Sequence, residues 1–182
     1  MVSELNIVKL ENESNELNEL VALMTNNNWE YHPDPKPSVE QIVKAYHKGW
    51  YQEDRETFWI EIDNRKIGLI IIHDIIDTIP SFDIRLDNSV RGRGVGTKVV
   101  NWITNYIFGL PDKKIRIEAY TRSDNIAMRK TFNKCGFVKE GYLRNAWENN
   151  DGSISDSICY AFIRSDWENK EITPIRLNDL PF

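Results

Sequence analysis

One short stretch of the sequence combines residue types that suit the binding of a phosphate. It consists of Arg91, Gly92, Arg93, Gly94, Val95, Gly96 and Thr97. An apolar run typical of a strand precedes it, and apolar residues at helical spacing follow it. At such a junction the N–H groups of the first helical turn are unpaired, and the helix dipole adds partial positive charge. Glycine lets the backbone approach a ligand closely, and arginine adds charge from the rim. We therefore expect a phosphate or pyrophosphate to bind here.

The spacing of the glycines decides between several kinds of loop. A dinucleotide-binding fingerprint requires a third glycine at the position of Thr97. A Walker loop ends in Gly-Lys-Ser/Thr, whereas Gly96, Thr97 and Lys98 stand in the wrong order. The pattern Arg91-x-x-Gly94-x-Gly96 remains, beside the simpler interpretation of a glycine-rich turn before an ordinary helix.

Length and composition limit the class of protein. The 182 residues, 41% hydrophobic and 28% charged, predict one globular domain over residues 1–182 with a sizeable core. The net charge of −5 and the lack of a long basic run argue against a nucleic-acid partner. No apolar run is long enough for a membrane span and no signal segment is seen, so we expect a cytoplasmic protein without a membrane partner. Cys135 and Cys159 form neither a zinc spacing nor a disulfide framework, so we expect no metal site.

The hydrophobic pattern predicts elements in the order β-α-α-β-β-β-α-β-α-β-β. Strands are expected over residues 5–11, 57–62, 66–76, 79–86, 114–120, 137–143 and 157–163. Helices are expected from 14 to about 26, from 38 to 46, from 95 to about 108 and from 125 to 135. Between the first two helices, Pro33, Pro35 and Pro37 forbid regular structure. The tail over residues 168–182 remains unassigned.

Two segments that follow the glycine loop in the sequence resemble motifs of a known family. Asn125-Ile126-Ala127 opens the last expected helix, and Lys134-Cys135-Gly136-Phe137 closes it. Together with the element order and the loop after the fourth strand, they resemble the GNAT (GCN5-related N-acetyltransferase) superfamily over roughly residues 5–167. The resemblance implies an α/β (α+β) fold in a single domain. Its mixed, mostly antiparallel sheet of about seven strands would carry helices on both faces and splay between strands four and five.

The last part of the chain is similar to one branch of that superfamily. The similar residues are Glu140 to Arg144, Asp151, Gly152, Asp156, Tyr160 and Arg164 to Trp167. They are similar to the RimJ/RimL-like branch, which includes acetyltransferases of protein N-termini, with related members that modify polyamines or aminoglycosides. The resemblance implies acetyl-CoA as the cofactor. The amides of residues 91–97 would hold its pyrophosphate, and the backbone of Ile84 and Leu86 would pair with the pantetheine as an added strand. Asn125 would bind the pantetheine or lie beside the thiol, unless it only caps its helix.

The implied chemistry is direct attack of a neutral amine on the thioester. It requires a group that takes the amine proton, an oxyanion donor and a proton for the leaving thiolate. The sequence departs from the family at three positions. Phe132 stands where many members have a thiolate-protonating tyrosine, Met128 where the branch often has serine, and Ser81 where it tends to have glutamate.

Other side chains are therefore candidates for the catalytic groups. Asp83 is the only acid between Ile79 and Leu86, although on a regular strand it faces away from Leu86. His73, at the end of the third strand, and Glu118, in the fifth, are the other candidates for a base, and water is a further one. The expected walls for the acceptor are Trp29, Tyr31, His32, Tyr142 and Trp147.

The sequence thus predicts an acetyl-CoA-dependent N-acetyltransferase that binds both substrates together, as a monomer or homodimer. Its acceptor is a small-molecule or peptide amine: a protein N-terminus, a polyamine or an aminoglycoside. The alternative is a non-catalytic acyl-CoA-binding or regulatory module, because the catalytic tyrosine is missing.

Overall fold

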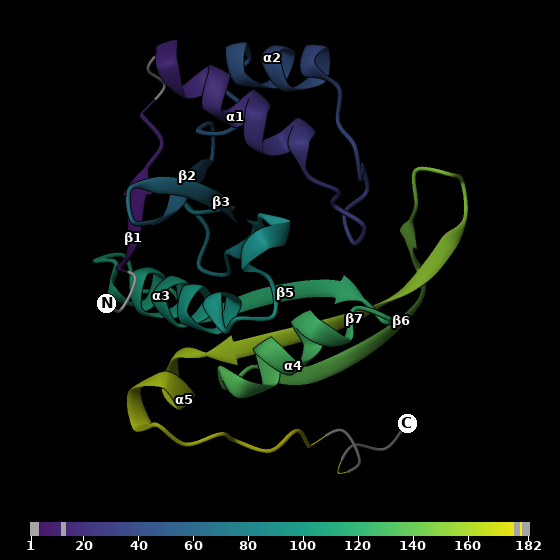
Figure 1. The fold of residues 1–182 in the computed structure, drawn as a ribbon. Helices are drawn as coiled ribbons and strands as arrows, with labels where there is room; N and C mark the ends of the chain where they lie inside the picture. Colours follow the sequence, from purple (N-terminus) through teal and green to yellow (C-terminus); the bar gives the residue numbers. More distant parts are fainter. Residues whose placement is uncertain (1–3, 12–13, 177–178, 180–182) are drawn as a thin grey trace.

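The computed structural model describes residues 4–11, 14–176 and 179, and one sheet organises them (Figure 1). Its strands are β1 Leu5–Lys9, β2 Arg55–Ile62, β3 Arg65–His73, β4 Ser81–Leu86, β5 Arg116–Arg122, β6 Val138–Glu148 and β7 Ile154–Ile163. The helices are α1 Ser14–Asn26, α2 Val39–His47, α3 Val95–Gly109, α4 Ile126–Lys134 and α5 Arg164–Asn169, with a short 3-10 turn at Asn88–Val90. No helix among these described residues is both long and apolar enough to cross a membrane.

The seven strands lie in the order β1-β2-β3-β4-β5-β7-β6. All neighbours are antiparallel except β4 and β5, which run parallel and pair only at Ser81 and Glu118. Beyond Ser81 the two strands diverge. This confirms the expected mixed sheet and its splay between the fourth and fifth strands.

Helices cover both faces of the sheet, as expected. On one face α1 and α2 pack over β2 and β3 through a cluster that includes Leu20, Trp59 and Ile71. On the other face α3 and α4 pack through a second cluster that includes Ile103 and Phe132. Figure 1 shows α1 and α2 together at one side and α3 and α4 at the other. Alternate residues of β4 therefore face different layers, with Phe82 and Ile84 toward α3 and α4.

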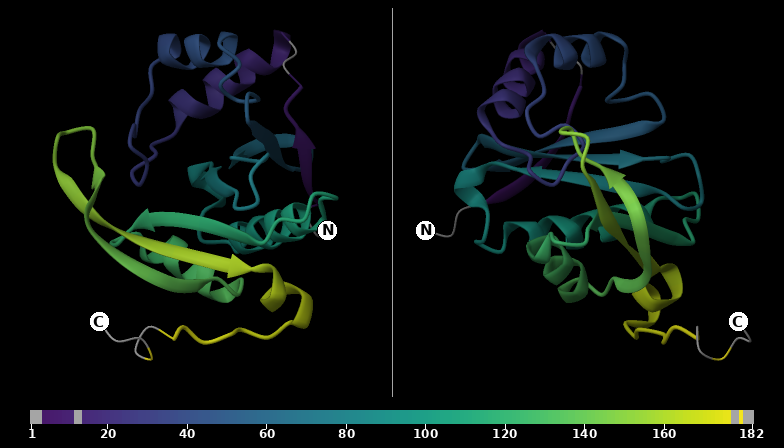
Figure 2. Two further views of the ribbon diagram at one scale, coloured as in Figure 1. Left: turned by 180° about the vertical axis from the view of Figure 1, so that it is seen from behind. Right: turned by 90° about the vertical axis from the view of Figure 1, so that its right-hand side faces the viewer.

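The hairpin of β6 and β7 is longer than the sequence pattern predicts. It reaches past the body of the sheet and curves toward the segment between α1 and α2 (Figure 2). The register shifts between Lys139 and Gly141 and again between Leu143 and Trp147, and Asn145 has a φ of 55°. These irregularities interrupt the alternation of apolar and polar residues, so the pattern predicts only the inner part of each strand.

Several other strand boundaries differ from the prediction by a few residues, and one helix was not predicted. The strand expected to run to residue 76 ends at His73, because Asp74 adopts a left-handed φ of 54°. The segment after β7, which the pattern left open beyond Trp167, forms α5. There the Asp166 carboxylate accepts hydrogen bonds from the backbone N–H and the hydroxyl of Thr173.

Candidate functional site

The glycine loop ends in a helix start that no side chain caps. Gly94 is the N-cap of α3 and has a left-handed conformation, with φ 79° and ψ 0°. No side chain accepts a hydrogen bond from the N–H groups of the first turn, which Val95, Gly96 and Thr97 supply. A Cβ on Gly94 would meet nothing within 4 Å, so the space in front of the loop is open. This geometry leaves donors and the positive end of the helix dipole facing an open space, as a pyrophosphate requires.

The splay supplies an open strand edge beside this helix start. The ladder between β4 and β5 contains only the pair Ser81 and Glu118. Residues 82–86 therefore have no strand partner on the β5 side among the described residues. An extended chain such as pantetheine can pair with an edge of this kind.

A cavity of about 370 Å³, here called the glycine-loop cavity, joins the helix start to the strand edge. Its walls come from the segment after α1, from β4, from the glycine loop and from α4. It is lined by Trp29, Glu30, Tyr31, His32, Ile84, Leu86, Arg91, Gly92, Gly94, Gly96, Thr97, Asn125, Ala127, Met128, Lys130, Thr131 and Lys134. Ile84, Leu86 and Asn125 of the predicted cofactor residues lie here beside the loop. Arg93 does not line it, and the Val95 side chain is buried in the core.

The α4 wall contains residues that sequence reasoning missed. Ala127, Lys130, Thr131 and Lys134 face the glycine loop, at intervals of three and four residues along one face of the helix. Lys130 and Lys134 bring positive charge to a cavity that already offers helix N–H groups. Their spacing is the signal that could have identified them, because such residues share one helix face.

Arg91 plays a different part from the rim charge that we predicted. Its Nε donates to the carbonyl of Leu86 at 2.8 Å, and its Nη2 donates to the carbonyl of Asn28 at 3.0 Å. Its guanidinium also lies 5.4 Å from the ring centroid of Trp29. Arg91 therefore ties the segment after α1 to the glycine loop.

A second cavity of about 250 Å³, here called the splay cavity, continues from the first between β4 and β5. The two share the lining residues Tyr31, His32, Ile84, Asn125 and Met128. The rest of the splay cavity is lined by Pro33, Ser81, Phe82, Asp83, Tyr120, Thr121, Phe132 and Trp147. Three of the predicted wall residues, Tyr31, His32 and Trp147, thus meet the predicted catalytic candidate Asp83. A chain bound in the first cavity would end where the second begins.

Asp83 reaches the splay cavity from a regular strand. The ladder between β3 and β4 has no bulge at its pair Ile71 and Asp83, and the opening of the sheet itself exposes the carboxylate. The two carboxylate oxygens lie 3.4 Å from Nδ1 of His32 and 3.4 Å from Nε of Arg85. Burial favours the neutral acid, but the charges of His32 and Arg85 outweigh it and hold the pKa of the Asp83 carboxyl well below its usual range. Asp83 is therefore a fixed anion at neutral pH.

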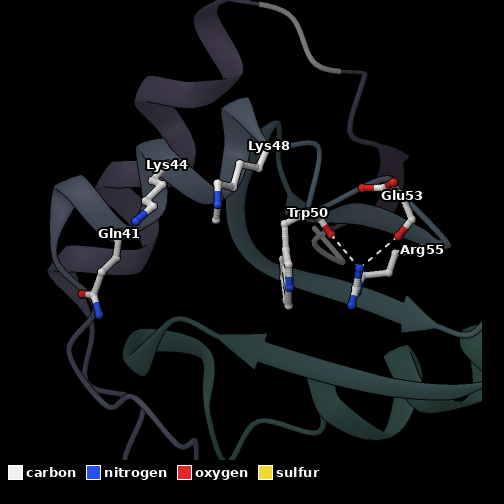
Figure 3. A pocket seen from close by; sticks show the side chains of 7 residues that line it. Gln41, Lys44, Lys48, Trp50, Glu53 and Arg55 are labelled. Carbon is white, nitrogen blue, oxygen red and sulfur yellow. Dashed lines mark hydrogen bonds between the residues drawn. The ribbon is translucent and has the colours of Figure 1, made fainter.

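His73 lies outside both cavities. Its Nδ1 accepts a hydrogen bond from Nε of Arg55 at 3.1 Å, and burial, as the largest cause, lowers its pKa. Arg55 in turn borders a third cavity of about 420 Å³ between α2 and the start of β2. Figure 3 shows Arg55 donating to the backbone oxygens of Trp50 and Glu53 there. This third cavity shares no lining residue with the other two.

Glu118 is held by two neighbours on its own strand. Its carboxylate accepts from Nε of Arg116 at 2.8 Å and from the hydroxyl of Tyr120 at 2.7 Å. The hydrogen bond to Glu118 is the main cause that raises the pKa of Tyr120. Of these three residues only Tyr120 lines the splay cavity.

Two of the predicted wall residues lie elsewhere. Tyr142 is 59% exposed and donates its hydroxyl proton to Asp156, away from both cavities. Trp29 is only 1% exposed, and its indole N–H donates to the carbonyl of Met24 at 2.8 Å. Trp29 touches only the glycine-loop cavity and serves mainly as packing beneath the segment after α1.

Asn125 caps α4 at the boundary of the two cavities. Its Oδ1 accepts from the N–H of Met128 at 3.1 Å, and its Nδ2 donates to the hydroxyl of Thr121 at 3.0 Å. The capping role that we considered for Asn125 is thus present.

A further residue, Arg122, donates from Nη1 to the carbonyl of Glu30 and to Oδ1 of Asn149, both at 3.1 Å. It joins the segment after α1 to the tip of the long hairpin.

Comparisons with known proteins agree with this arrangement. A model of the acetyltransferase (GNAT) domain family matches residues 4–138. A chimera of spermidine N-acetyltransferase SpeG from Vibrio cholerae and hSSAT superposes with a TM-score of 0.78 at 23% identity, covering 92% of this chain and 99% of its own. The Vibrio cholerae enzyme in complex with CoA and spermine gives 0.76 at 22% identity, covering 91% and 98%. Its dodecameric form in an intermediate state gives 0.74 at 22% identity, covering 91% and 97%. No curated protein matches the sequence.

The structural likenesses, at such low identity, establish the fold, and the family model establishes the family. That model spans well over half of the 182 residues. The helix start, the strand edge and the lysines of α4 fit the phosphates and the extended arm of CoA. The chain therefore belongs to the GNAT acetyltransferases and is an N-acetyltransferase that uses acetyl-CoA as its donor.

Proposed function

We propose that this acetyltransferase acts on a cationic primary amine, with a polyamine as the first candidate, and that the splay cavity holds the acceptor. The carrying observation is the charge of that cavity. Among the residues that the structure describes, its lining contains one carboxylate, Asp83, and no lysine or arginine. Arg85 balances part of that charge, but it lines neither cavity. Its guanidinium lies over the ring of Trp29. The cavity thus presents an anion to a bound amine.

The aromatic walls support the same acceptor. Tyr31 and Trp147 also line the splay cavity, and such aromatic side chains attract an ammonium and pack against methylene groups. A neighbour of the same fold is solved with CoA and spermine, which makes a polyamine the first acceptor to test. A protein N-terminus and an aminoglycoside are also cationic amines and belong in the same assay.

We propose that residues 91–97, Ile84, Leu86 and Asn125 hold the CoA as the sequence predicted, with Lys130 and Lys134 added. The amides would take the pyrophosphate, and the edge of β4 would take the pantetheine. Acetyl-CoA, when bound, supplies the activated acetyl group as a thioester at the boundary of the two cavities.

The transfer is direct, with no acetylated cysteine. Cys135 and Cys159 line neither cavity. Burial raises the pKa of the Cys135 thiol to about 11, so that the thiol stays protonated and unreactive at neutral pH. Both substrates must therefore be bound at the same time.

We also propose that residues 1–182 act as one domain of the RimJ/RimL-like branch, in the cytoplasm, as a monomer or homodimer. The single sheet that runs from β1 to β6 supports one domain. The motifs over residues 140–144 and 164–167 support the branch. Light scattering of the purified protein measures its assembly directly.

The acceptor is tested by amine-dependent thiol release from acetyl-CoA. Spermidine, an aminoglycoside, a short peptide with a free N-terminus and an amino acid with two carboxylates are compared in wild type and in Asp83→Asn. We expect spermidine to give the highest kcat/KM and the dicarboxylate to give none. Asp83→Asn should reduce the ratio of kcat/KM between cationic and uncharged amines by about fivefold, because one charge–charge interaction at partly screened range is worth about 1 kcal/mol.

Equal turnover of cationic and dicarboxylate amines would contradict this proposal. Glu140→Gln provides a matched control, since Glu140 is an acid that pairs with Arg116 at 2.9 Å and lines neither cavity. It should leave the order of the acceptors unchanged.

A further inference from the structure

We infer that His32 accepts the proton of the attacking amine and that Asp83 is its positioning residue. This inference rests on the proposed function, because it requires an amine in the splay cavity. At the sequence level His32 was predicted only as a wall for the acceptor.

The position of His32 fits this role. It is one of the few residues that line both cavities, so its ring lies where amine and thioester must meet. Its side chain is 19% exposed, which leaves access from the cavity. The Nδ1 atom lies 3.4 Å from Oδ1 of Asp83. An imidazole whose Nδ1–H faces a carboxylate carries its free electron pair on Nε2, which is the arrangement of a general base.

The other titratable groups of the splay cavity are unsuited to take the proton. Asp83 is a weak base because the pKa of its carboxyl is held well below its usual range. Burial raises the pKa of Tyr31, and the hydrogen bond to Glu118 raises that of Tyr120, so that both phenols keep their protons. His32 is the one remaining basic group among the residues that line the cavity.

The segment that carries His32 is held firmly in place. The His32 N–H donates to the carbonyl of Trp29 at 2.8 Å, and the Trp29 N–H donates to the carbonyl of Pro35 at 2.9 Å. The Trp29 ring lies edge-on to the imidazole, with 6.1 Å between centroids. Trp29 itself is buried and lies between Arg85 and Arg91. A base positioned in this way needs no movement of the loop to reach its partner.

The proton and bond changes balance around this one imidazole. The attacking nitrogen, which has already lost its ammonium proton to water, forms a bond to the acetyl carbon, and the carbon–sulfur bond of the thioester breaks. One proton leaves the nitrogen for Nε2 of His32. The imidazolium, stabilised by the Asp83 carboxylate, then gives that proton to the leaving sulfur. His32 thus replaces the thiolate-protonating tyrosine whose position Phe132 occupies.

The decisive variant is His32→Asn. The asparagine amide nitrogen can take the place of Nδ1 and keep the contact with Asp83, but it has no basic atom where Nε2 was. We expect kcat with spermidine to fall by roughly 10²-fold, the lower end for a general base. The KM for acetyl-CoA and the melting temperature should stay the same as in the wild-type protein. His47→Asn is the matched control, because His47 is exposed on α2 and lines none of the three cavities.

Two further measurements separate catalysis from structure. The first is the pH profile of kcat, which should change shape in His32→Asn because the base is removed. Other charged or titratable groups around His32 and Asp83 also affect the pH dependence of kcat. They are Arg85 on β4, His73 on β3, and Tyr31, Tyr51 and Tyr120, in addition to Asp83 itself. As a single change, Asp83→Asn should lower kcat. Added to His32→Asn it should have little further effect, since Asp83 acts through the imidazole.

The outcomes are distinct. A folded His32→Asn variant whose kcat stays within about threefold of wild type would overturn the assignment of the base. Additive losses in the double variant would overturn the positioning role of Asp83. If wild type itself turned over no cationic amine, the proposed acceptor would fail first, and the inference about His32 with it.

Discussion

Gly96→Ala separates binding of the cofactor from stability of the fold. A Cβ on Gly96 would lie 3.8 Å from Leu86 Cδ1 and 3.9 Å from Thr131 Cγ2, which is ordinary van der Waals contact. The fold therefore accepts it, and replacing a helical glycine by alanine should stabilise α3 by up to about 1 kcal/mol. The same methyl group enters the glycine-loop cavity, where the pyrophosphate must approach the helix N–H groups. Loss of one hydrogen bond to a charged group costs about 1.5–3 kcal/mol, which weakens binding roughly 10- to 150-fold.

Calorimetric titration with CoA, together with a thermal melt, measures both effects on one sample. We expect a weaker Kd and a melting temperature that is unchanged or higher by roughly 2–4 °C. Gly109→Ala at the other end of α3 is the control, because a Cβ there would meet nothing within 4 Å and Gly109 lines none of the three cavities. An unaltered CoA affinity in folded Gly96→Ala would refute the placement of the pyrophosphate at this helix start.

Three further variants test other parts of the site. Phe132→Leu should cost about 1–2 kcal/mol of stability in a urea titration, while kcat per folded molecule changes little, because its ring is buried against aromatic neighbours. The double variant Lys130→Ala, Lys134→Ala should weaken CoA binding by up to about tenfold at low salt and less at high salt, with Lys44→Ala as control. The carboxyl of Asp83 has a folded pKa below its unfolded value, so its ionisation stabilises the fold above about pH 4 and this contribution is lost as the pH falls. Unfolding titrations should therefore show a larger deficit for Asp83→Asn at about pH 7 than at about pH 3.

The fold followed closely from local patterns in the sequence. Each helix that faces a core repeats apolar residues at helical spacing, and most strands alternate or are continuously apolar, so that their type and order could be predicted. The outer parts of β6 and β7 could not, because their pairing shifts register around Gly141 and Asn145 and the side chains stop alternating. The short α5 was not foreseen either, since its Asp166 finds its partner only at Thr173, in the tail.

The parts of the site that depend on local sequence could be predicted, and the parts that depend on contacts between distant segments could not. The glycine loop is one continuous segment, so spacing alone predicted where an anion would bind. The contact between His32 and Asp83 joins two segments 51 positions apart, 83 against 32, and no local pattern encodes it. Residue type does not reveal burial either. Trp29 and Tyr142 were expected to line opposite walls of the acceptor site, but Trp29 is packed in the core and Tyr142 is exposed to solvent.

The central claim is the direct transfer of an acetyl group from acetyl-CoA to a cationic amine bound beside it. Initial rates of thiol release with acetyl-CoA and spermidine varied together test this most directly. Double-reciprocal lines that intersect, with acetylated spermidine as the product identified by mass spectrometry, are the result that the account predicts. Parallel lines would show an acetylated enzyme instead, and thiol release that does not depend on any amine would contradict the claim itself.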